Sequence, residues 1–365
     1  MSGTSADGID AALCRIRGTG ADVELELLSH RSTPLPRALT ERIASASTAV
    51  DVAELDAELG ERFGRAALSL LRHAGVDPRE VDFVSSHGQT LVHLPSRLSR
   101  TPNSLQVGEP ARIAALTGRP VVADFRPADM AHGGEGAPLV PYADWALFRG
   151  RRGYRALQNI GGIANVSVVG PRLEHTLAFD TGPGNMLLDA LVRRHTRGAR
   201  GFDRGGRLAA QGRVLPGLLS TLMGHPFLQE RPPRSAGREN FGEGLAERLW
   251  QRHKARPLDL LATATAFTVE SLAAAYRAWV LPRHRLEAVF VSGGGSRNPV
   301  MMALLARALA PVPVRPFSDL GLPEAAKEAA CFALLGHECV MGTPQNVPAA
   351  TGARRAVVLG RICLG

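Results

Sequence analysis

Asp180 stands where catalytic side chains tend to occur in α/β proteins. It belongs to Phe-Asp-Thr-Gly-Pro-Gly-Asn at 179–185, after an apolar run at 176–179 and before a helical pattern that begins at Met186. No Lys or Arg occurs within three residues of it. Ligands of α/β proteins settle at the carboxyl ends of strands and near helix N-termini. A purely structural Asp that bonds turn amides is equally compatible with the local sequence.

Polar residues also follow a second apolar run. The run at 81–85 predicts a short buried strand, and Ser-His-Gly-Gln-Thr comes directly after it at 86–90. His87, Gln89 and a Thr are thus expected at one strand end, beside a glycine that allows close approach. Such a group is typical of a binding edge, although a lone His is more often structural.

Arg126 follows the predicted strand 121–123 in the same way. A buried guanidinium grips a carboxylate or a phosphate with two parallel hydrogen bonds. Pairing of Arg126 with Asp124 or Asp129 for purely structural reasons is equally compatible with the sequence.

Turns of small residues recur along the chain. They contain the residues 1–10, 161–162, 182–184 and 292–299. Small-residue turns can present backbone amides to a phosphate, and a glycine turn between strand and helix allows close approach to a nucleotide. The chain contains neither Gly-x-x-x-x-Gly-Lys-Ser/Thr nor the protein-kinase motifs, so nucleotide binding would have to use these turns and strand-end acids.

The spacing of apolar residues predicts the elements that carry these side chains, and it indicates an α/β chain. Strands are predicted at 11–16, 23–28, 81–85, 121–123, 157–160, 163–166, 176–179, 287–291 and 356–359, the last pairing back into the first lobe. Helices are predicted at 51–75, 206–223, 258–281, around 302–309 and at 323–341.

Length and composition favour a soluble protein of two lobes. The chain has 365 residues, of which 45% are hydrophobic. We expect no membrane span, because no run of about 18 apolar residues is apparent, and no signal peptide in the first ten residues, so a cytoplasmic location is predicted. The four cysteines are scattered and are interpreted as reduced.

The formal net charge of +9 does not by itself indicate a nucleic-acid partner. Only Lys254 and Lys327 are lysines among the 43 basic residues, and the arginines are spread along the chain. A nucleic-acid face would show clustered basic residues, so we expect no nucleic-acid binding. Excess positive charge can instead steer an anionic substrate.

Several motifs together resemble the anhydro-N-acetylmuramic acid kinase family, in the family's order and over nearly the whole chain. They lie at 1–10, 86–90, 124–126, 136–141, 159–165, 179–185, 292–299 and 351–353. The resemblance implies the two-lobed fold of the sugar kinase, Hsp70 and actin superfamily, which is ribonuclease H-like. ATP and Mg²⁺ would bind in the cleft between lobes, which we expect at 1–130 with 352–365, and at 131–351.

The resemblance also implies an activity and residue roles. Such kinases open the 1,6-anhydro ring of anhydro-N-acetylmuramic acid with water and phosphorylate O6, giving N-acetylmuramic acid 6-phosphate for cell-wall recycling. Asp180 would be the base, and Asp7 would meet Mg²⁺ through water. Around the sugar we expect His87, Gln89, Arg126 and Glu328. The residues expected at ATP are Gly3, Thr4, Ser5, Ala6, Asp7, Gly8, Ile9, Asp10, Gly161, Gly162, Asn165, Gly182, Gly184, Asn185, Gly293, Gly294, Gly295 and Asn298. A homodimer is expected.

Two departures from the family pattern remain. Members usually carry an apolar strand before Met-Ser-Gly-Thr-Ser, and this strand would be central in the first lobe's sheet. Either the natural chain starts upstream, which we favour, or activity is compromised. Ala6 stands where Met or Leu is usual, a change expected to affect packing. Two alternatives are kept: a kinase for another 1,6-anhydro sugar such as levoglucosan, and a non-catalytic nucleotide-binding homologue.

Overall fold

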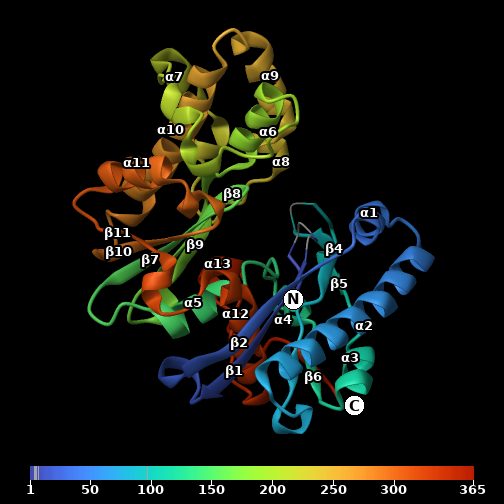
Figure 1. Ribbon diagram of the computed structural model, residues 1–365. Helices are drawn as coiled ribbons and strands as arrows, with labels where there is room; N and C mark the ends of the chain where they lie inside the picture. Colours follow the sequence, from blue (N-terminus) through green and yellow to red (C-terminus); the bar gives the residue numbers. More distant parts are fainter. Residues whose placement is uncertain (4–5, 7, 97) are drawn as a thin grey trace. The chain divides into compact units, whose positions relative to one another are not determined.

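The chain forms two compact units in the computed structural model, which describes residues 1–3, 6, 8–96 and 98–365. Unit 1 comprises Met1–Phe148 and Gly321–Gly365, and unit 2 comprises Arg149–Leu320 (Figure 1). The predicted boundaries at 130/131 and 351/352 therefore differ from the observed ones. The reason is that α12 (Glu324–Val340) bonds the first part of the chain: Ser85 Oγ donates to Phe332 O at 2.5 Å, and Gly20 N donates to Glu338 Oε1 at 2.8 Å. Because Tyr142 Oη also donates to Glu338 Oε1 at 2.9 Å, and Lys327 pairs with Asp144 at 2.9 Å, α5 (Val140–Phe148) belongs to unit 1 with α12.

Unit 1 combines three small sheets with helices. Its strands are β1 (Gly8–Arg17), β2 (Glu24–Pro34), β3 (Val84–Ser85), β4 (Gln89–Leu94), β5 (Asn103–Val107), β6 (Val121–Ala123) and β12 (Arg361–Cys363). Its helices are α1 (Arg37–Ser45), α2 (Ala49–Ala74), α3 (Pro110–Thr117), α4 (Phe125–Ala131), α5 (Val140–Phe148), α12 (Glu324–Val340) and α13 (Pro348–Thr351), with single 3₁₀ turns at Gly20–Asp22 and Pro78–Glu80.

The sheets of unit 1 pair as β1-β2, β12-β6-β3 and β4-β5. Strand β3 is parallel to β6, and β12 is antiparallel to it. Helix α2 begins at a capping box between Thr48 and Asp51 and ends at Gly75, which is left-handed at φ 69°. Its buried face, including Leu55, Leu59 and Phe63, joins the unit's core.

A cavity of about 380 Å³ separates two of these sheets within unit 1. It is lined by β1, by α2 residues such as Phe63 and Leu70, by β3 and by α12 residues such as Phe332. Among the described strands, β1 pairs only with β2, and β3 pairs only with β6. The edges of β1 and β3 that face the cavity therefore retain hydrogen-bonding capacity. A central strand at this place stays a prediction.

Unit 2 is an α/β unit around one sheet. Its strands are β7 (Tyr154–Ile160), β8 (Ile163–Val169), β9 (Leu177–Pro183), β10 (Leu286–Ser292) and β11 (Val314–Pro316). Its helices are α6 (Met186–His195), α7 (Pro216–Met223), α8 (Arg238–Phe241), α9 (Glu243–His253), α10 (Pro257–Ala275) and α11 (Pro299–Leu309). A π-helical turn, Tyr276–Val280, extends α10, and 3₁₀ turns lie at Leu173–His175, Arg204–Gly206, Ala209–Gln211, Pro226–Gln229, Gly294–Arg297 and Phe317–Leu320.

The strand order of this sheet is β11-β10-β7-β8-β9. Strands β7, β8 and β9 form an antiparallel meander, and β10 and β11 run parallel to β7. This is the order of the ribonuclease H-like sheet that the family resemblance implies, and the predicted α/β class is confirmed. The carboxyl ends of β7, β9 and β10 consequently meet at one edge of the sheet.

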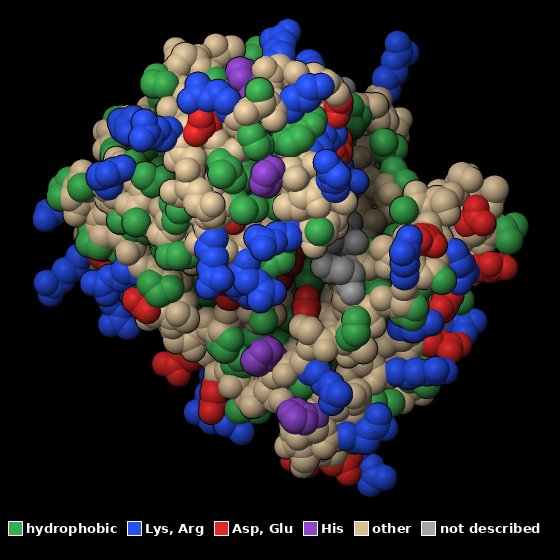
Figure 2. Space-filling view, turned by 45° about the horizontal axis from the view of Figure 1, so that its top comes forward, with side chains coloured by type: hydrophobic (Ala, Val, Ile, Leu, Met, Phe, Trp, Pro, Cys, Tyr) green, Lys and Arg blue, Asp and Glu red, His purple; other side chains and the backbone are tan. Residues whose placement is uncertain are grey.

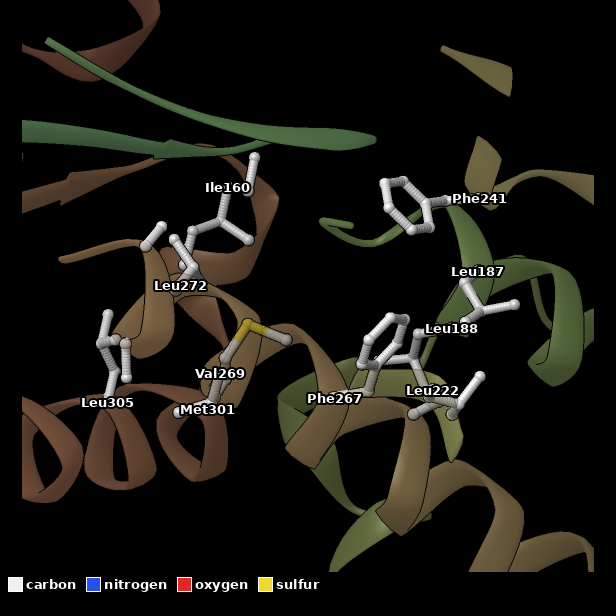
Figure 3. Packing of buried hydrophobic residues seen from close by; sticks show 14 of the residues in the cluster. Ile160, Leu187, Leu188, Leu222, Phe241, Phe267, Val269, Leu272, Met301 and Leu305 are labelled. Carbon is white, nitrogen blue, oxygen red and sulfur yellow. The ribbon is translucent and has the colours of Figure 1, made fainter. Parts of the chain in front are cut away.

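The core of unit 2 lies between this sheet and its helices. Figure 3 shows Met301 and Leu305 of α11 near Val269 and Leu272 of α10, and Phe267 near Leu188 and Leu222. All of these are buried apolar side chains of one cluster. Burial of each such side chain contributes about 1.5 to 3 kcal/mol to the free energy of unfolding. The sheet edge is therefore supported by a well-packed core.

One helix of unit 2 meets the length and composition of a membrane span, contrary to our expectation of none. It is Pro257–Val280, with a mean hydropathy of 1.3 over the most apolar window. However, 78% of that window is buried inside the protein, where α10 packs against α11 and β9. Its apolar character is therefore that of a core helix.

Two predicted elements differ from those observed. The region 206–223 is α-helical only at Pro216–Met223, because the backbone is extended at Gly212, with ψ 171°, and at Leu215, with ψ 102°. The last strand is Arg361–Cys363 instead of 356–359, and it pairs with β6 of unit 1 as predicted. The β4-β5 hairpin was not predicted.

Basic side chains are scattered over the face shown in Figure 2, among acidic and apolar ones. Many arginines lie within reach of acids: Arg42 with Glu58, and Arg194 with Glu243 and Glu247, are examples. Ion pairs of this kind neutralise much of the local charge of each unit.

Candidate functional site

Three glycine turns of unit 2 lie together at the edge formed by β7, β9 and β10. The turn 161–162 follows β7, the turn 182–184 ends β9, and the turn 293–295 follows β10. Gly184 N donates to Gly162 O at 3.0 Å, and Asn185 N donates to Gly161 O at 2.7 Å. The structure thus brings together the glycines predicted from three separate segments.

Glycine is required at two of these positions. A Cβ on Gly184 would lie 2.2 Å from Gly161 O, which is backbone. Gly293 has φ 86°, and a Cβ there would lie 2.5 Å from Ile160 O. The turns therefore approach one another closely through their backbones. Helix α6 begins at Met186, after the turn 182–184, and α11 begins at Pro299, after the 3₁₀ turn Gly294–Arg297. Backbone amides and two helix N-termini at one sheet edge can accommodate phosphates.

Two predicted ATP residues of this region support the backbone. Asn185 Nδ2 donates to Ile160 O at 3.0 Å, which links two of the turns. Asn298 caps α11, because its Oδ1 accepts from Val300 N at 3.1 Å and from Met301 N at 3.2 Å. Their side chains have structural partners, and a nucleotide contact by either remains a prediction.

Asp180 lies inside β9, three residues before its end, whereas we expected it after the strand. The β8-β9 register shifts here: Asn165 faces Asp180, whereas Ala164 faces Gly182, so Thr181 is an extra residue. A bulge of this kind re-aims the neighbouring side chain. Asp180 Oδ2 accepts from Ala236 N at 2.7 Å.

The pKa of Asp180 is raised above the ordinary carboxyl value, because burial disfavours the charged form. Hydrogen bonds from Ala236 N and the Ser235 hydroxyl, and the charge of Arg234, oppose this effect. Among the described residues, no ion pair engages the carboxylate. A carboxylate in such surroundings is a stronger base than an exposed one.

The loop that contacts Asp180 was not predicted to have a functional role. The sequence Pro-Pro-Arg-Ser at 232–235 predicted only a loop, and no local signal connects it with a residue more than 50 positions earlier. In the structure Arg234, Ser235 and Ala236 all bond Asp180. Only tertiary structure brings these segments together.

In unit 1 the structure brings His87 and Arg126 together. Arg126 Nη2 and Nε lie 3.0 and 3.3 Å from His87 Nε2, and Arg126 Nη1 donates to Gly136 O at 2.9 Å. Burial and the Arg126 charge lower the pKa of His87 to about 3. The ring is therefore neutral, with Nε2 as acceptor and Nδ1 facing Gly88 O.

The structural alternative for Arg126 is wrong. Asp124 pairs with Arg361 at 3.5 Å. Asp129 is fully buried, and its carboxylate accepts from Gly136 N, Asn346 Nδ2 and Thr351 Oγ1. In the described part of the chain, neither acid bonds Arg126. Its charge remains available to an anion.

Gln89 has an unsatisfied acceptor. Its side chain is 1% exposed, and its Nε2 donates to Thr90 O at 3.2 Å. Its Oε1 is buried and has no hydrogen-bond partner among the described residues. A buried acceptor without a donor is costly, so a ligand hydroxyl or amide would stabilise it.

Glu328 lies on the α12 surface and is exposed. Its charge acts on Arg126 and on the Met1 amino group, and both effects favour the positive forms. Burial raises the pKa of the Glu328 carboxyl, which belongs to the same charged neighbourhood as Arg126. Its contact with a sugar stays a prediction.

The predicted first phosphate loop is only partly described. Thr4, Ser5 and Asp7 lie outside the described residues. Gly8, Ile9 and Asp10 belong to β1; Ile9 is buried in the core, and Asp10 accepts from Ser32 Oγ. Gly3 O accepts from Ala6 N at 3.0 Å, and Ala6 is buried with φ 50°. The Ile9 side chain is thus a packing residue.

Comparisons with known proteins agree over the full length of the chain. The family model described as anhydro-N-acetylmuramic acid kinase matches residues 1–365. A protein of that name from Caldanaerobacter subterraneus subsp. tengcongensis is 41% identical over 378 residues, covering 100% of this chain and 96% of the relative. One from Bacillus cereus is 41% identical over 373 residues, covering 99% and 97%.

Solved structures resemble the chain at a lower level. Component A of (R)-2-hydroxyglutaryl-CoA dehydratase from Acidaminococcus fermentans has 11% identity and a TM-score of 0.42, covering 89% of this chain and 96% of that one. A ROK hexokinase from Thermus thermophilus has 16% identity and a TM-score of 0.35, covering 89% and 98%. The full-length family match and the 41% identity carry the assignment: the chain belongs to the anhydro-N-acetylmuramic acid kinase family.

Proposed function

We propose that this protein uses ATP to phosphorylate O6 of 1,6-anhydro-N-acetylmuramic acid while water opens the anhydro ring. The product is N-acetylmuramic acid 6-phosphate, in the recycling of peptidoglycan. The observation that carries the assignment to a site is Asp180: a half-buried carboxylate with one oxygen fixed by Ala236 N, on a bulge next to three glycine turns.

The bond changes balance as follows. The oxygen of water bonds to the anomeric carbon as the bond from that carbon to O6 breaks. O6 keeps the electron pair and attacks the γ-phosphorus, whose bond to the β-bridging oxygen breaks, so ADP leaves. Asp180 takes a proton from water and later releases it to solvent. Proton abstraction by a placed side chain contributes about 10²- to 10⁴-fold, and positioning contributes much of the rest.

The raised pKa of Asp180 suits this role. Its conjugate acid is weaker than that of an exposed carboxylate, so the ionised form abstracts a proton more readily. Because Ala236 N fixes Oδ2, Oδ1 is the oxygen proposed to take the proton.

The three glycine turns of unit 2 are proposed to hold ATP. Their backbones approach one another closely, and a polyphosphate would meet their amides near the α6 and α11 N-termini. Mg²⁺ would accompany ATP. An ion of this kind keeps several waters and is held mainly by phosphates, and Asp7 is its proposed protein partner. Mg²⁺ supplies charge neutralisation on the transferred phosphoryl group.

The pair His87–Arg126 and Gln89 are proposed to recognise the sugar. The Arg126 guanidinium fits the lactyl carboxylate, and neutral His87 holds it in orientation. The Oε1 of Gln89, which has no hydrogen-bond partner among the described residues, fits a hydroxyl or amide donor of the sugar. Glu328 is the fourth residue proposed to contact the sugar.

The test is ATP-dependent phosphorylation of anhydro-N-acetylmuramic acid, run beside levoglucosan and beside Asp180→Asn. We expect turnover of the first sugar, which disappears in the Asn variant. Preference for levoglucosan, which lacks the lactyl and acetamido groups, would contradict the proposed substrate. Chelation with EDTA should abolish turnover, and excess Mg²⁺ should restore it. A homodimer and a cytoplasmic location are part of the proposal, and sedimentation velocity checks the first.

A further inference from the structure

Arg234 is buried in unit 2, yet it forms no ion pair with an acid among the described residues. Its side chain is 7% exposed. Instead of a carboxylate, it meets five backbone carbonyl oxygens: those of Asp180, Thr181, Phe227, Leu228 and Glu230. A buried guanidinium with all three nitrogens engaged by neutral acceptors has a fixed position and keeps its full charge.

Two of these contacts fix the bulge that aims Asp180. Arg234 Nε donates to Asp180 O at 2.9 Å, and Nη2 donates to Thr181 O at 3.3 Å. In the other direction, Asp180 N donates to Arg234 O at 3.1 Å. Both backbone groups of Asp180 are therefore bound by this one residue.

The remaining contacts hold Arg234 itself. Nη1 donates to Phe227 O, Leu228 O and Glu230 O at 3.2, 3.1 and 2.8 Å. The guanidinium carbon lies 4.8 Å from the Phe227 ring centroid and 5.5 Å from that of Phe179, distances at which a cation interacts with an aromatic face. Arg234 thus joins the 3₁₀ turn 226–229 to β9.

Resting on the proposed function, we infer that Arg234 is a positioning residue for the candidate base. It holds the Asp180 bulge through its hydrogen bonds, and it favours the ionised carboxylate through an unneutralised charge that does not itself bond that carboxylate. The Asp180 oxygens remain for Ala236 N, Ser235 and water. An ion pair with Arg would instead have weakened the base.

The charged groups around Asp180 are few. In the described part of the chain, Arg234 is the charged group that acts on Asp180, and it favours ionisation. Burial lowers the pKa of Arg234, and the charges of Glu230 and Asp180 oppose this effect. The two effects of Arg234, bond geometry and charge, can therefore be separated by substitution.

Arg234→Lys keeps the charge and loses the five-carbonyl arrangement, since an ammonium has three donors on one atom. Its kcat should fall about 10-fold or more, as expected for small displacements of a catalytic group, with the acid limb of the pH–kcat profile unmoved. Arg234→Met also removes the charge. Its kcat should fall further, and the acid limb should move to higher pH because ionised Asp180 loses its stabilising charge. KM for ATP should stay within about twofold in both variants, as expected for loss of an interaction that does not serve ground-state binding.

Arg234→Gln covers the possibility that the Met variant does not fold. Its amide keeps hydrogen-bond donors toward the backbone carbonyls without the charge, so the acid limb should again move to higher pH. Arg231→Met is the matched control. Arg231 is an exposed arginine three positions away, and its loss should leave both kcat and the limb unchanged.

The outcomes distinguish this inference from the proposed function. If Asp180→Asn is inactive while folded Arg234→Lys keeps the wild-type kcat, the positioning role is overturned. It is also overturned if folded Arg234→Met or Arg234→Gln leaves the acid limb in place. If the wild type has no kinase activity, or Asp180→Asn retains it fully, the proposed function fails instead.

Discussion

Gly184 lies so close to Gly161 that a Cβ on the former would come within 2.2 Å of the carbonyl oxygen of the latter. The two residues come from different turns, after β7 and at the end of β9, and the neighbouring amides of Asn185 and Gly184 bond across them. The relative position of the two turns is thus set by direct backbone contact.

Gly184→Ala should separate the two turns. Backbone cannot yield as a flexible side chain can, so we expect a loss of about 1 to 3 kcal/mol in the free energy of unfolding, and about a 100-fold fall in kcat/KM for ATP. Urea unfolding and initial rates measure the two effects. Gly217→Ala is the control: a Cβ there meets nothing within 4 Å, it lies in α7, and it should be neutral or slightly stabilising. Equal stability and rates for both variants would refute the argument.

As pH falls through the raised pKa of Asp180, activity should fall, whereas the contribution of this group to stability should rise. Activity requires the ionised carboxylate, so the rate should fall as pH falls through the raised pKa. A folded-state pKa above the unfolded value means that the folded protein binds this proton more tightly. The charged group therefore destabilises the fold at neutral pH, and this effect disappears below the unfolded pKa.

Asp180→Asn should consequently unfold at a higher temperature than the wild type at pH 7, with the difference shrinking as pH falls. The amide oxygen can still accept from Ala236 N. Differential scanning calorimetry at pH 7 and at pH 4 checks this. A lower melting temperature for the Asn variant at pH 7 would show that the carboxylate is stabilising and would contradict the sign.

His87 should remain neutral throughout the physiological range. Its pKa is lowered to about 3, by burial first and then by Arg126. The unfolded state takes up a proton near pH 6.5 and the folded state does not, so stability is present above that value and is lost as pH falls from about 6.5 toward 3. The loss amounts to a few kcal/mol.

His87→Gln removes this titration and should flatten the stability profile between pH 6.5 and 4, as measured by urea unfolding. NMR of the imidazole provides an independent check: the His87 ring should show no titration shift above about pH 5. Titration of that ring near pH 6.5 would mean that the site is more hydrated than the contacts to Phe332 and Arg126 indicate.

The cavity beside β1 should accept an added strand. Asp10 N donates to Met1 O at 2.9 Å, so Met1 lies antiparallel to β1, and residues attached before it would run along β1 into the cavity. Burying two or three apolar side chains there contributes about 2 to 6 kcal/mol, offset in part by the cost of ordering the segment.

A six-residue extension with alternating Val and Ile should therefore raise the melting temperature by several degrees. A Gly/Ser extension of the same length is the control and should leave it unchanged. If both extended chains have the same melting temperature as the unmodified chain, the cavity does not bind a strand.

Local sequence determined much of the scaffold. The capping box at Thr48 and the terminal Gly75 bound α2 within two residues of the prediction, and the glycine pair 161–162 separates β7 from β8 as expected. These features depend on neighbours within a few positions, where φ preferences and hydrogen bonds between nearby residues decide the conformation. The motifs that indicated the family are also local, and the full-length match confirms them.

Tertiary structure decided what the side chains contact. Arg126 is bonded to His87 instead of to Asp124 or Asp129, and Asp180 lies on a bulge held by Arg234, 54 positions later in the chain. Strand register and loop packing are set by the sum of many distant contacts, which apolar periodicity does not encode. The unit boundaries also depend on distant contacts, since α12 bonds Ser85 and Gly20 of the first part of the chain. The sequence therefore indicated which residues form a kinase site. The packing of distant segments determined which groups those residues bond and whether they carry a proton.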